Sequence, residues 1–346
     1  MCDTMDPKEK FDLITKNLQE VVGEEEILDI LKQRDLKVYI GTAPTGKPHF
    51  GYFVWVLKLG ELLKAGCEVT MLFANMHAYL DNMKSSWELL EHRTKYYELL
   101  IKQMLVQANV PIEKLRFIEG TKFQLKEDYT LDMNKLSALA STRDTTRAGA
   151  EVVKQSDNPK MSGLLYPILQ ALDEQYLGVD AQLGGVDQRK IFMFAREFLP
   201  KIGYKKRVHL MSPLIPGLGE SGKMSSSEPN SKIDFDDSDK QIIKKINKAF
   251  SVDGVVEGNG LLAILKYIVF RLKAAGEKFV IQRPEKYGGT ISFDDYKSVE
   301  QAFVSKKLAS VDLKQGISQE IIELVSPVRK VLEENQELYD LSYPKK

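Results

Sequence analysis

Two glycine-rich loops hold the side chains that could act on phosphate groups. The first loop, GTAPTGKP, runs from Gly41 to Pro48 and includes Pro44, Gly46 and Lys47. It nearly matches the phosphate-binding pattern GxxxxGK(S/T), but Pro48 at the last position offers neither a hydroxyl group for magnesium nor an N–H group for phosphate. The mismatch argues against a P-loop nucleoside triphosphatase, although the loop follows a predicted strand, as that motif requires.

The residues after this loop suggest another way to hold phosphate. His49 follows Pro48 at the start of a helix predicted over 49–64, where the missing N–H group of proline is no loss. Phosphate groups could lie on that helix N-terminus, with His49 donating a hydrogen bond and the small Gly51 leaving room for adenine and ribose. A histidine at a helix start is by itself more often a cap or a packed ring.

The second loop, GLGESGKMSSS, runs from Gly217 to Ser227 and carries a single lysine, Lys223. Such a composition usually belongs to a flexible surface linker. This loop, however, comes about 170 residues after the first and directly follows the last predicted strand of the sheet. Open α/β sheets bind ligands at that edge, so the second loop strengthens the prediction of a phosphate site.

Composition limits the classes of protein that this chain can be. The 346 residues include 49 Lys plus Arg and 49 Asp plus Glu, so a polyanionic partner must be held by a local basic patch. The shares of hydrophobic residues, 43%, and charged residues, 28%, are typical of globular proteins and exclude disordered, collagen-like and coiled-coil chains. A core of this size needs no disulfide and no structural metal.

Cysteine, histidine and terminal patterns give the expected compartment. Cys2 and Cys67 are the two cysteines and the four histidines are scattered, so no zinc-binding cluster is expected. The charged N-terminus lacks the apolar core of a signal peptide, and the most apolar stretch, 52–57, is too short to span a membrane. We expect a soluble cytoplasmic protein with no zinc, no organic cofactor and no membrane partner.

Short apolar runs and helical patterns alternate along the first two thirds of the chain, which predicts a doubly wound, parallel α/β sheet. The strands are predicted at 36–41, 68–75, 116–120, 179–183 and 208–211. The helices between them are predicted at 49–64, 85–107, 130–140, 164–177 and 187–199.

We divide the chain into three parts. Residues 1–35 predict N-terminal helices, 36–235 predict the sheet domain with a connective segment at 85–160, and 236–346 predict a separate all-helical domain. The boundary is placed in the polar stretch 232–238. Helical patterns in the last part lie at 239–251, 258–274, 293–306 and 318–337.

The segments around both loops resemble the class I aminoacyl-tRNA synthetases. PTGKPHFGY is similar to their HIGH signature and KMSSS to their KMSKS loop. Together with FANMHAYLDN, GLLYPILQALD and VDAQLGGVDQRK, these segments resemble the tyrosyl-tRNA synthetases of eukaryotic and archaeal type, over about residues 8–340. In two departures from the signatures, Tyr52 replaces the second histidine and Ser226 the second lysine, and each removes one phosphate ligand.

The resemblance implies a Rossmann-like catalytic domain, a helical anticodon-binding domain and a homodimer that uses the segment 85–160. It implies that the carboxylate of L-tyrosine attacks the α-phosphate of ATP, which brings Mg²⁺ with it. The tyrosyl group then passes to the 3′ end of tRNA(Tyr). Since a carboxylate is already ionised at pH 7, the first step requires no general base.

The resemblance also assigns the ATP site. Its catalytic residues are His49, on the phosphates, and Lys223, on the β- and γ-phosphates. Met211 matches a backbone contact to adenine. The other ATP-binding positions are Gly41, Pro44, Gly46, Gly51, Tyr52, Gly185, Asp187, Met224 and Ser225.

The tyrosine pocket combines helical spacing with the resemblance. Tyr166, Gln170 and Asp173 share one face of the helix predicted at 164–177, and such a polar row is usually solvated. Asp173, at the margin of a mostly buried helix, needs a partner. The resemblance places Tyr166 and Gln170 near the amino group of tyrosine and Asp173 at its phenol. It adds Gln188 as a contact and Tyr39, otherwise an ordinary core aromatic, as a second reader of the hydroxyl group; His77 is either a pocket residue or a packed one.

The resemblance places tRNA on both domains. Arg147 and Arg189 are candidates for the acceptor end, and Tyr287 and Asp312 for the first anticodon base. By spacing alone, Tyr287 is a packed ring and Asp312 a helix N-cap. Lys240, Lys244, Lys245 and Lys248 line one helix face, which is either a solvated face or a phosphate patch.

Two alternatives stay open. One is a tryptophanyl-tRNA synthetase, which the pairing of Tyr39 with Asp173 disfavours. The other is a catalytically inactive, synthetase-like RNA-binding protein, which the presence of His49, Lys223 and the pocket row disfavours.

Overall fold

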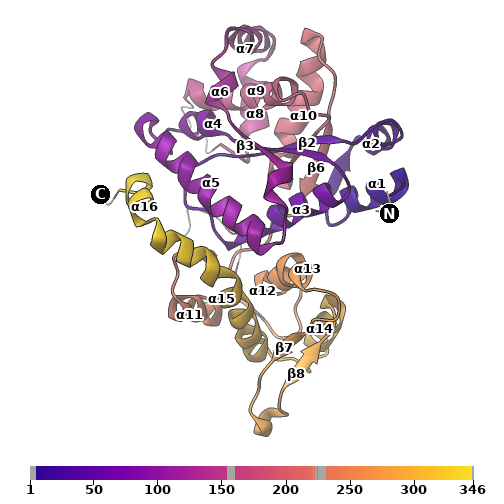
Figure 1. Cartoon of the computed structure of the whole chain (residues 1–346), viewed down its shortest axis with the longest axis vertical. Helices are drawn as coiled ribbons and strands as arrows, with labels where there is room; N and C mark the ends of the chain where they lie inside the picture. The colour runs from indigo at the N-terminus through magenta and orange to yellow at the C-terminus, as the bar shows by residue number, and fades with distance from the viewer. Residues whose placement is uncertain (1–4, 154–159, 221, 223, 225–230, 345–346) are drawn as a thin grey trace.

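The computed structural model describes residues 5–153, 160–220, 222, 224 and 231–344. Its upper part in Figure 1 contains a six-stranded sheet in the order β1-β6-β5-β2-β3-β4. Every neighbouring pair is parallel except β1 and β6, which are antiparallel. The strands are β1 (Glu20–Val22), β2 (Lys37–Thr42), β3 (Glu68–Phe73), β4 (Leu115–Glu119), β5 (Ala181–Gly185) and β6 (Val208–Ser212).

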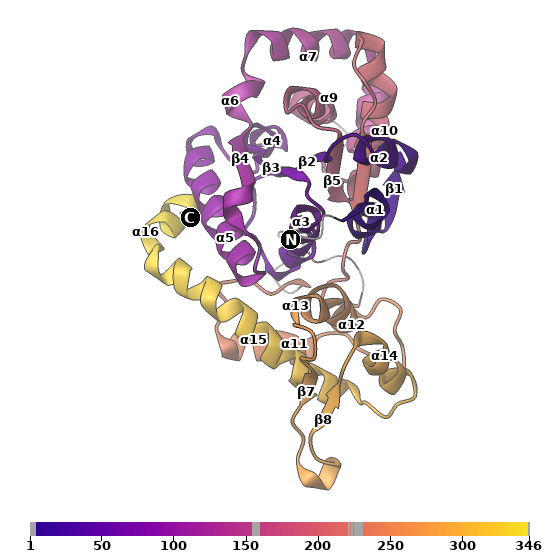
Figure 2. The same cartoon turned by 45° about the vertical axis from the view of Figure 1, so that its right-hand side comes forward.

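Helices cover both faces of this sheet (Figures 1 and 2). The α-helices of the upper part are α1 (Pro7–Thr15), α2 (Glu24–Leu31), α3 (Phe53–Lys64), α4 (Asn75–Leu80), α5 (Leu90–Gln107), α6 (Thr121–Gln124), α7 (Glu127–Leu139), α8 (Thr142–Gly149), α9 (Met161–Tyr176) and α10 (Arg189–Phe198). Single 3-10 turns are η1 (Phe50–Tyr52), η2 (Trp87–Leu89), η3 (Ile112–Lys114), η4 (Val186–Gln188) and η5 (Leu199–Ile202).

Alternate residues of the central strand β2 enter two different cores. Val38 and Ile40 are buried in the core that contains α3 and α5, whereas Tyr39 is buried in the core that contains α9 and α10. Successive side chains of a strand point to opposite faces, so this division follows from the strand itself. It turns Tyr39 toward α9, the helix that carries Tyr166, Gln170 and Asp173.

The lower part of the molecule follows β6 in the chain (Figure 1). It contains helices and one two-stranded antiparallel ribbon, β7 with β8. Its elements are α11 (Asp239–Lys248), α12 (Gly260–Ile264), the π-turn η7 (Leu265–Val269), α13 (Phe270–Leu272), β7 (Phe279–Ile281), the 3-10 turn η8 (Glu285–Tyr287), β8 (Ile291–Phe293), α14 (Tyr296–Val304), α15 (Ser310–Glu334) and α16 (Gln336–Ser342).

The predicted α/β class with a parallel, doubly wound sheet is confirmed, with three local differences. The N-terminal part includes the edge strand β1 and is not helical alone, and the C-terminal part includes β7 and β8 and is not all-helical. All three strands have three residues, which is too short for a period of two to be read from sequence. α15 also begins at Ser310, eight residues before the prediction.

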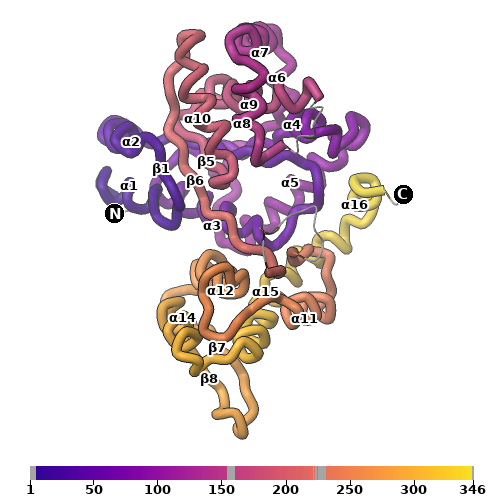
Figure 3. The backbone as a smooth tube through the Cα atoms, turned by 180° about the vertical axis from the view of Figure 1, so that it is seen from behind, coloured from indigo at the N-terminus to yellow at the C-terminus, as the bar shows by residue number. Residues whose placement is uncertain are grey.

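The upper and lower parts pack on each other over a shared apolar core. The ring of Phe235, in the connection, lies 6.1 Å from the ring of Phe53 in α3. Arg271 of α13 donates hydrogen bonds to the carbonyl of Val54, at 3.2 Å, and to Glu61, at 2.8 Å. α16, at the end of the described chain, lies beside α5 of the upper part (Figures 1, 2 and 3). The three-part division therefore stays a prediction about folding units.

Helices of membrane-spanning length and apolarity do not occur among the residues that the structure describes.

Candidate active site

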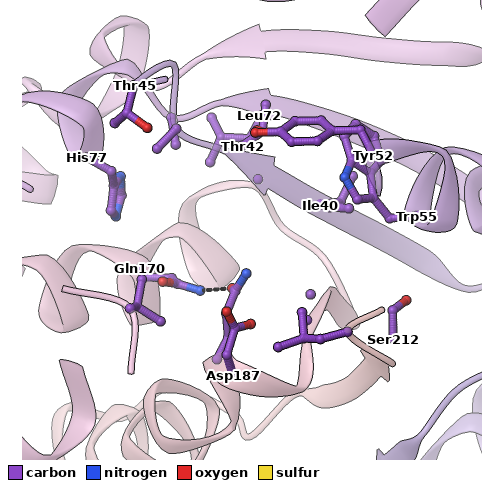
Figure 4. Close-up of a pocket in the computed structure, with 18 of the residues that line it drawn as sticks. Ile40, Thr42, Thr45, Tyr52, Trp55, Leu72, His77, Gln170, Asp187 and Ser212 are labelled. Atoms are coloured by element: carbon purple, nitrogen blue, oxygen red, sulfur yellow. Dashed lines mark hydrogen bonds between the residues drawn. The ribbon is translucent and has the colours of Figure 1, made fainter. Parts of the chain in front are cut away.

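A cavity of about 620 Å³ opens at the carboxyl ends of β2, β5 and β6. Figure 4 shows Gln170 and Asp187 on one side of it and Thr42 and Tyr52 on the other. Ligands of open α/β sheets bind at this edge. The predicted site residues that line the cavity are Tyr39, Gly41, Gly46, His49, Gly51, Tyr52, Tyr166, Gln170, Asp173, Gly185, Asp187, Gln188 and Met224.

Two of the described residues that were predicted to bind ATP are not in this lining, and two further ones cannot be placed. Pro44 is buried in the loop, and Met211 lies in β6 with a fully buried side chain, next to Ser212, which does line the cavity. Lys223 and Ser225 lie outside the described residues.

His49 lies at the N-cap of η1 as a neutral ring. Its Nδ1 accepts a hydrogen bond from the backbone N–H of Gly51 at 3.2 Å, which leaves the ring proton on Nε2. Burial and, second, the charge of Lys232 lower the pKa of His49 to about 3. A Cβ atom on Gly51 would lie 3.0 Å from the His49 ring and 3.1 Å from the sulfur of Met224. Glycine is therefore needed here for close packing, and His49 can donate a hydrogen bond from Nε2 without carrying a charge.

Asp173 is the most buried carboxylate of the cavity, with 1% of its surface exposed. Its Oδ1 accepts hydrogen bonds from Gln124 Nε2 and from the hydroxyl of Tyr129, both at 2.8 Å. Its Oδ2 lies 3.7 Å from Nε2 of His77. Burial raises the pKa of Asp173 to about 8, although both donated hydrogen bonds lower it. Oδ1 is thus occupied by protein donors, and Oδ2 is the oxygen left for a ligand.

The other tyrosine candidates surround Asp173. The hydroxyl of Tyr39 lies 3.4 Å from the carbonyl of Gln170, and Gln170 Nε2 donates to Gln188 Oε1 at 2.7 Å. The ring of Tyr166 meets His77 edge to face at 4.7 Å. His77 lines the cavity with 2% of its surface exposed, and burial lowers its pKa to about 3. His77 is therefore both a packed and a pocket residue.

Several polar residues of the site were not predicted. Asp81 and Lys84 line the cavity and pair at 2.5 Å, across a turn in which Asn82 and Met83 have positive φ angles of 53° and 57°. Non-glycine residues rarely adopt positive φ angles, and those that do are often found at functional sites. Gln124 and Tyr129 are held behind Asp173, and Lys232, 4% exposed, pairs with Asp234. The sequence signal for Asp81 and Lys84 is the polar turn that follows α4.

Four buried polar atoms around the cavity lack a hydrogen-bond partner among the residues that the structure describes: His77 Nε2, Asp81 Oδ1, Gln124 Oε1 and Gln182 Oε1. Buried polar groups are usually paired, so the cavity is suited to a ligand with several polar groups. In the described part of the chain, groups of three or more His, Cys, Asp or Glu that could hold a metal ion do not occur.

The predicted tRNA residues lie apart from the cavity. Arg147 is exposed on α8, and Arg189, at the start of α10, forms hydrogen bonds of 2.8 and 2.9 Å with Glu20. Tyr287 is 64% exposed on η8, so it is not a packed ring. Asp312 is not an N-cap: it lies in the first turn of α15 and pairs with Arg283 at 3.2 Å.

The four lysines that were predicted on one helix face all lie on α11. Among them, Lys245 pairs with Asp237 at 2.6 Å. Lys245 is thus partly used in an internal ion pair.

Comparisons with known proteins agree with this geometry. The family described as tRNA synthetases class I (W and Y) matches residues 31–326. The cytoplasmic tyrosine–tRNA ligase of Saccharomyces cerevisiae is 53% identical over 98% of this chain and 88% of its own. The cytoplasmic tyrosine–tRNA ligase of Danio rerio is also 53% identical, over 99% of this chain but 65% of its own length.

Among solved structures, the tyrosyl-tRNA synthetase of Archaeoglobus fulgidus complexed with L-tyrosine has a TM-score of 0.85. It is 35% identical to this chain, and the match covers 94% of this chain and 100% of that one. The sequence resemblance is therefore confirmed at the level of the family. The chain belongs to the class I aminoacyl-tRNA synthetases, and within them to the tyrosyl-tRNA synthetases.

Proposed function

We propose that the chain activates L-tyrosine with ATP to tyrosyl-adenylate and transfers the tyrosyl group to the 3′ end of tRNA(Tyr). Membership of the family supports both steps, and the related proteins carry the name tyrosine–tRNA ligase. The observation that carries the choice of amino acid is the buried Asp173 with one oxygen left for a ligand, beside the hydroxyl of Tyr39. The names of the relatives include the word cytoplasmic, and we expect the same compartment for this chain.

Asp173 and Tyr39 read the phenol hydroxyl of tyrosine. The substrate hydroxyl forms a hydrogen bond with the free oxygen of Asp173, which a phenylalanine ring would leave buried and unpaired. Sites built to bind a hydroxyl group reject the analogue that lacks it, and tyrosyl-tRNA synthetases are the standard example of this effect. An indole ring carries its N–H elsewhere, which disfavours tryptophan. At the other end of the substrate, Tyr166 and Gln170 hold the amino group, and Gln188, which accepts a hydrogen bond from Gln170, is a further contact.

ATP binds along the first loop, with Mg²⁺ on its phosphate oxygens. The tyrosine carboxylate attacks the α-phosphorus, the bond to the bridging oxygen of the β-phosphate breaks, and pyrophosphate leaves. His49 donates from Nε2 to the phosphates, and Lys223 meets the charge that grows on the leaving pyrophosphate. Because the nucleophile is already ionised, the protein acts by positioning and by charge stabilisation.

The tRNA and a second copy of the chain are the proposed partners. Tyr287 is exposed for stacking on an unpaired anticodon base, and Asp312 offers a carboxylate that Arg283 holds in place. Arg147 and Arg189 serve the acceptor end. Exposed leucines on α7 and just before it, Leu125, Leu131 and Leu139, lie within the segment predicted for dimerisation and support a homodimer.

Amino-acid-dependent ATP–pyrophosphate exchange tests the proposal. We expect exchange with tyrosine alone when all twenty amino acids are offered. Exchange with tryptophan alone would select the first alternative, and the absence of exchange with any amino acid would select an inactive RNA-binding protein.

A further inference from the structure

Lys47, the lysine of the P-loop-like sequence, does not line the cavity, although its neighbours Thr45 and Gly46 do. Its Nζ donates to Oδ2 of Asp236 at 2.8 Å and contacts the hydroxyl of Tyr339 in α16. The ammonium group also lies over the Tyr339 ring, 4.5 Å from its centroid. The Tyr339 hydroxyl donates to the same carboxylate at 3.0 Å. Lys47 is thus held in a three-membered polar cluster on the side of α16.

The backbone of the same loop is held by α5. Arg93 donates from Nη1 to the carbonyl of Thr45 at 3.0 Å, and the buried hydroxyl of Tyr97 donates to the carbonyl of Gly46. Both carbonyls belong to residues that line the cavity. Side chains outside the cavity therefore fix the position of its loop.

Arg93 joins this loop to α16 and to a second edge of the cavity. Its Nε donates to the carbonyl of Ser342 at 3.0 Å, and its Nη1 also donates to the carbonyl of Lys84 at 2.6 Å. Its guanidinium group lies 4.9 Å from the centroid of the Tyr343 ring. One guanidinium group thus links three segments: the first loop, the turn at Lys84 and the C-terminal helix.

α16 is packed firmly enough to act as an anchor. Ser342 is fully buried. The rings of Tyr339 and Tyr343 pack against Tyr96 of α5 at centroid distances of 5.9 and 5.3 Å. Aromatic pairs at these distances stabilise a contact beyond the area that they bury.

We infer that α16 is a positioning element of the ATP site: through Lys47 and Arg93 it holds the loop at residues 43–48 in the conformation that receives the phosphates. The inference rests on the proposed function, in which this loop binds ATP. A loop fixed before binding loses less conformational freedom when the ligand arrives, so its ligand binds more tightly. Lys47 therefore acts through the loop and Tyr339, and is a positioning residue that does not touch the phosphates.

The test measures ATP and tyrosine separately in the full chain. Lys47→Met is expected to raise the KM for ATP in pyrophosphate exchange by about fivefold to tenfold, the scale of one charge-assisted hydrogen bond. The Kd for tyrosine and the rate of tyrosyl transfer from preformed adenylate to tRNA should stay within twofold of the parent values. Tyr339→Phe should raise the KM for ATP less than Lys47→Met does. The double variant should resemble Lys47→Met, since both substitutions break the same cluster.

Arg271→Met is the matched control. It breaks another contact between the lower and upper parts, with Glu61 and with the backbone carbonyl of Val54, both in α3 and outside the loop at residues 43–48. We expect it to lower thermal stability and to leave the KM for ATP unchanged. Lys47→Arg, which keeps the charge, should recover most of the parent KM for ATP.

Two results would overturn the inference. One is an unchanged KM for ATP in Lys47→Met. The other is a rise of the KM for ATP that is matched by an equal rise of the Kd for tyrosine, with the same pair of changes in Arg271→Met. The parent protein is assayed first. If the parent protein shows no tyrosine-dependent exchange, the proposed function is contradicted. If the parent is active and Lys47→Met has the same KM for ATP, only the positioning role is contradicted.

Discussion

At the proposed tyrosine end of the cavity, buried side chains of helices and of a central strand form the lining, whereas at the proposed ATP end the backbone of a loop contributes to it. Asp173 projects from α9 and is fixed by Gln124 and Tyr129 from two further helices. At the other end, the carbonyls of Thr45 and Gly46 are held from outside the cavity.

The difference matches what each end has to do. Discrimination between amino acids depends on leaving a buried group unpaired when the wrong ligand binds, which requires burial and rigidity. Phosphate transfer requires backbone and cationic groups at the place where charge develops, and a loop allows the nucleotide to enter and pyrophosphate to leave. Substitutions at the tyrosine end should therefore have large effects on the choice of amino acid. Substitutions at the ATP end should affect the rate of adenylate formation or the KM for ATP.

The largest effect is expected for Asp173→Ala. The change leaves the phenol of the substrate without a partner. It also removes one hydrogen bond each from Gln124 and from Tyr129, whose hydroxyl keeps the carbonyl of Leu169. At about 1–3 kcal/mol for the buried phenol and about 1 kcal/mol for each of the two lost hydrogen bonds, kcat/KM for tyrosine in pyrophosphate exchange should fall by about a thousandfold. Tyr39→Phe should reduce the preference for tyrosine over phenylalanine by a smaller factor, about tenfold.

Asp132 provides the control for Asp173. It is also a buried carboxylate, 4% exposed, but it pairs with Tyr176 at 2.9 Å and with Lys135 at 2.9 Å, outside the cavity. Asp132→Asn should lower stability and keep the parent ratio of tyrosine to phenylalanine. If Asp173→Ala and Tyr39→Phe also keep that ratio, these two residues do not read the hydroxyl group.

Lys223→Ala should give the next largest effect, on the ATP end. The charge that Lys223 meets develops during the reaction, so the rate of adenylate formation should fall by about 100-fold while tyrosine binding changes little. Pre-steady-state kinetics with a tyrosine titration separates the two quantities. Equal losses in both would show that Lys223 supports the pocket as a whole.

Sequence patterns pointed to the loop at the proposed ATP end of the cavity, but not to the residues that hold Asp173 at the other end. Loops are rich in glycine, proline and serine, so the first loop and the adjacent His49 can be located from the sequence alone. Gln124 and Tyr129 lie 49 and 44 residues before Asp173 in the chain. No short pattern marks them, because their role depends on the packing of α6 and α7 against α9.

Lys47 is a second example of a residue whose role local patterns do not predict. Its spacing to glycine resembles a phosphate-binding lysine, yet its partner Tyr339 lies 292 residues away and turns it from the cavity. Interactions over such a separation are made by the tertiary fold and leave no local pattern. The same holds for Arg93, which a helical pattern at 85–107 presents as one polar residue among many.

The pH dependence of stability tests the protonation state of Asp173. The pKa of Asp173 in the folded protein is raised to about 8, above its value in the unfolded chain, so the stability linked to its protonated form is lost as pH rises toward 8. His49 and His77, with pKa values lowered to about 3, act in the opposite direction, but only below about pH 6.5, where unfolded histidines bind protons.

Between pH 6.5 and 8 the contribution of Asp173 can therefore be isolated. The melting temperature of the ligand-free protein should fall with pH by about 1–2 °C per pH unit more than that of Asp173→Asn, which cannot ionise. Parallel dependences of the melting temperature on pH for the two proteins would place the pKa of Asp173 below pH 6.5.

The smallest effect is expected for Asp312→Ala, in the first turn of α15 in the lower part of the molecule. A carboxylate can accept hydrogen bonds from the Watson–Crick edge of a guanine-type base, and Arg283 holds Asp312 in place for that contact. Loss of about 1 kcal/mol would raise the KM for tRNA about fivefold and leave adenylate formation unchanged. Asp253→Ala is the matched control, because Asp253 accepts a hydrogen bond of 2.7 Å from Ser310 at the start of the same helix. It should loosen α15 without altering base preference. The decisive measurement uses tRNA changed at the first anticodon base: if Asp312→Ala penalises the changed tRNA as strongly as the parent does, Asp312 does not read that base.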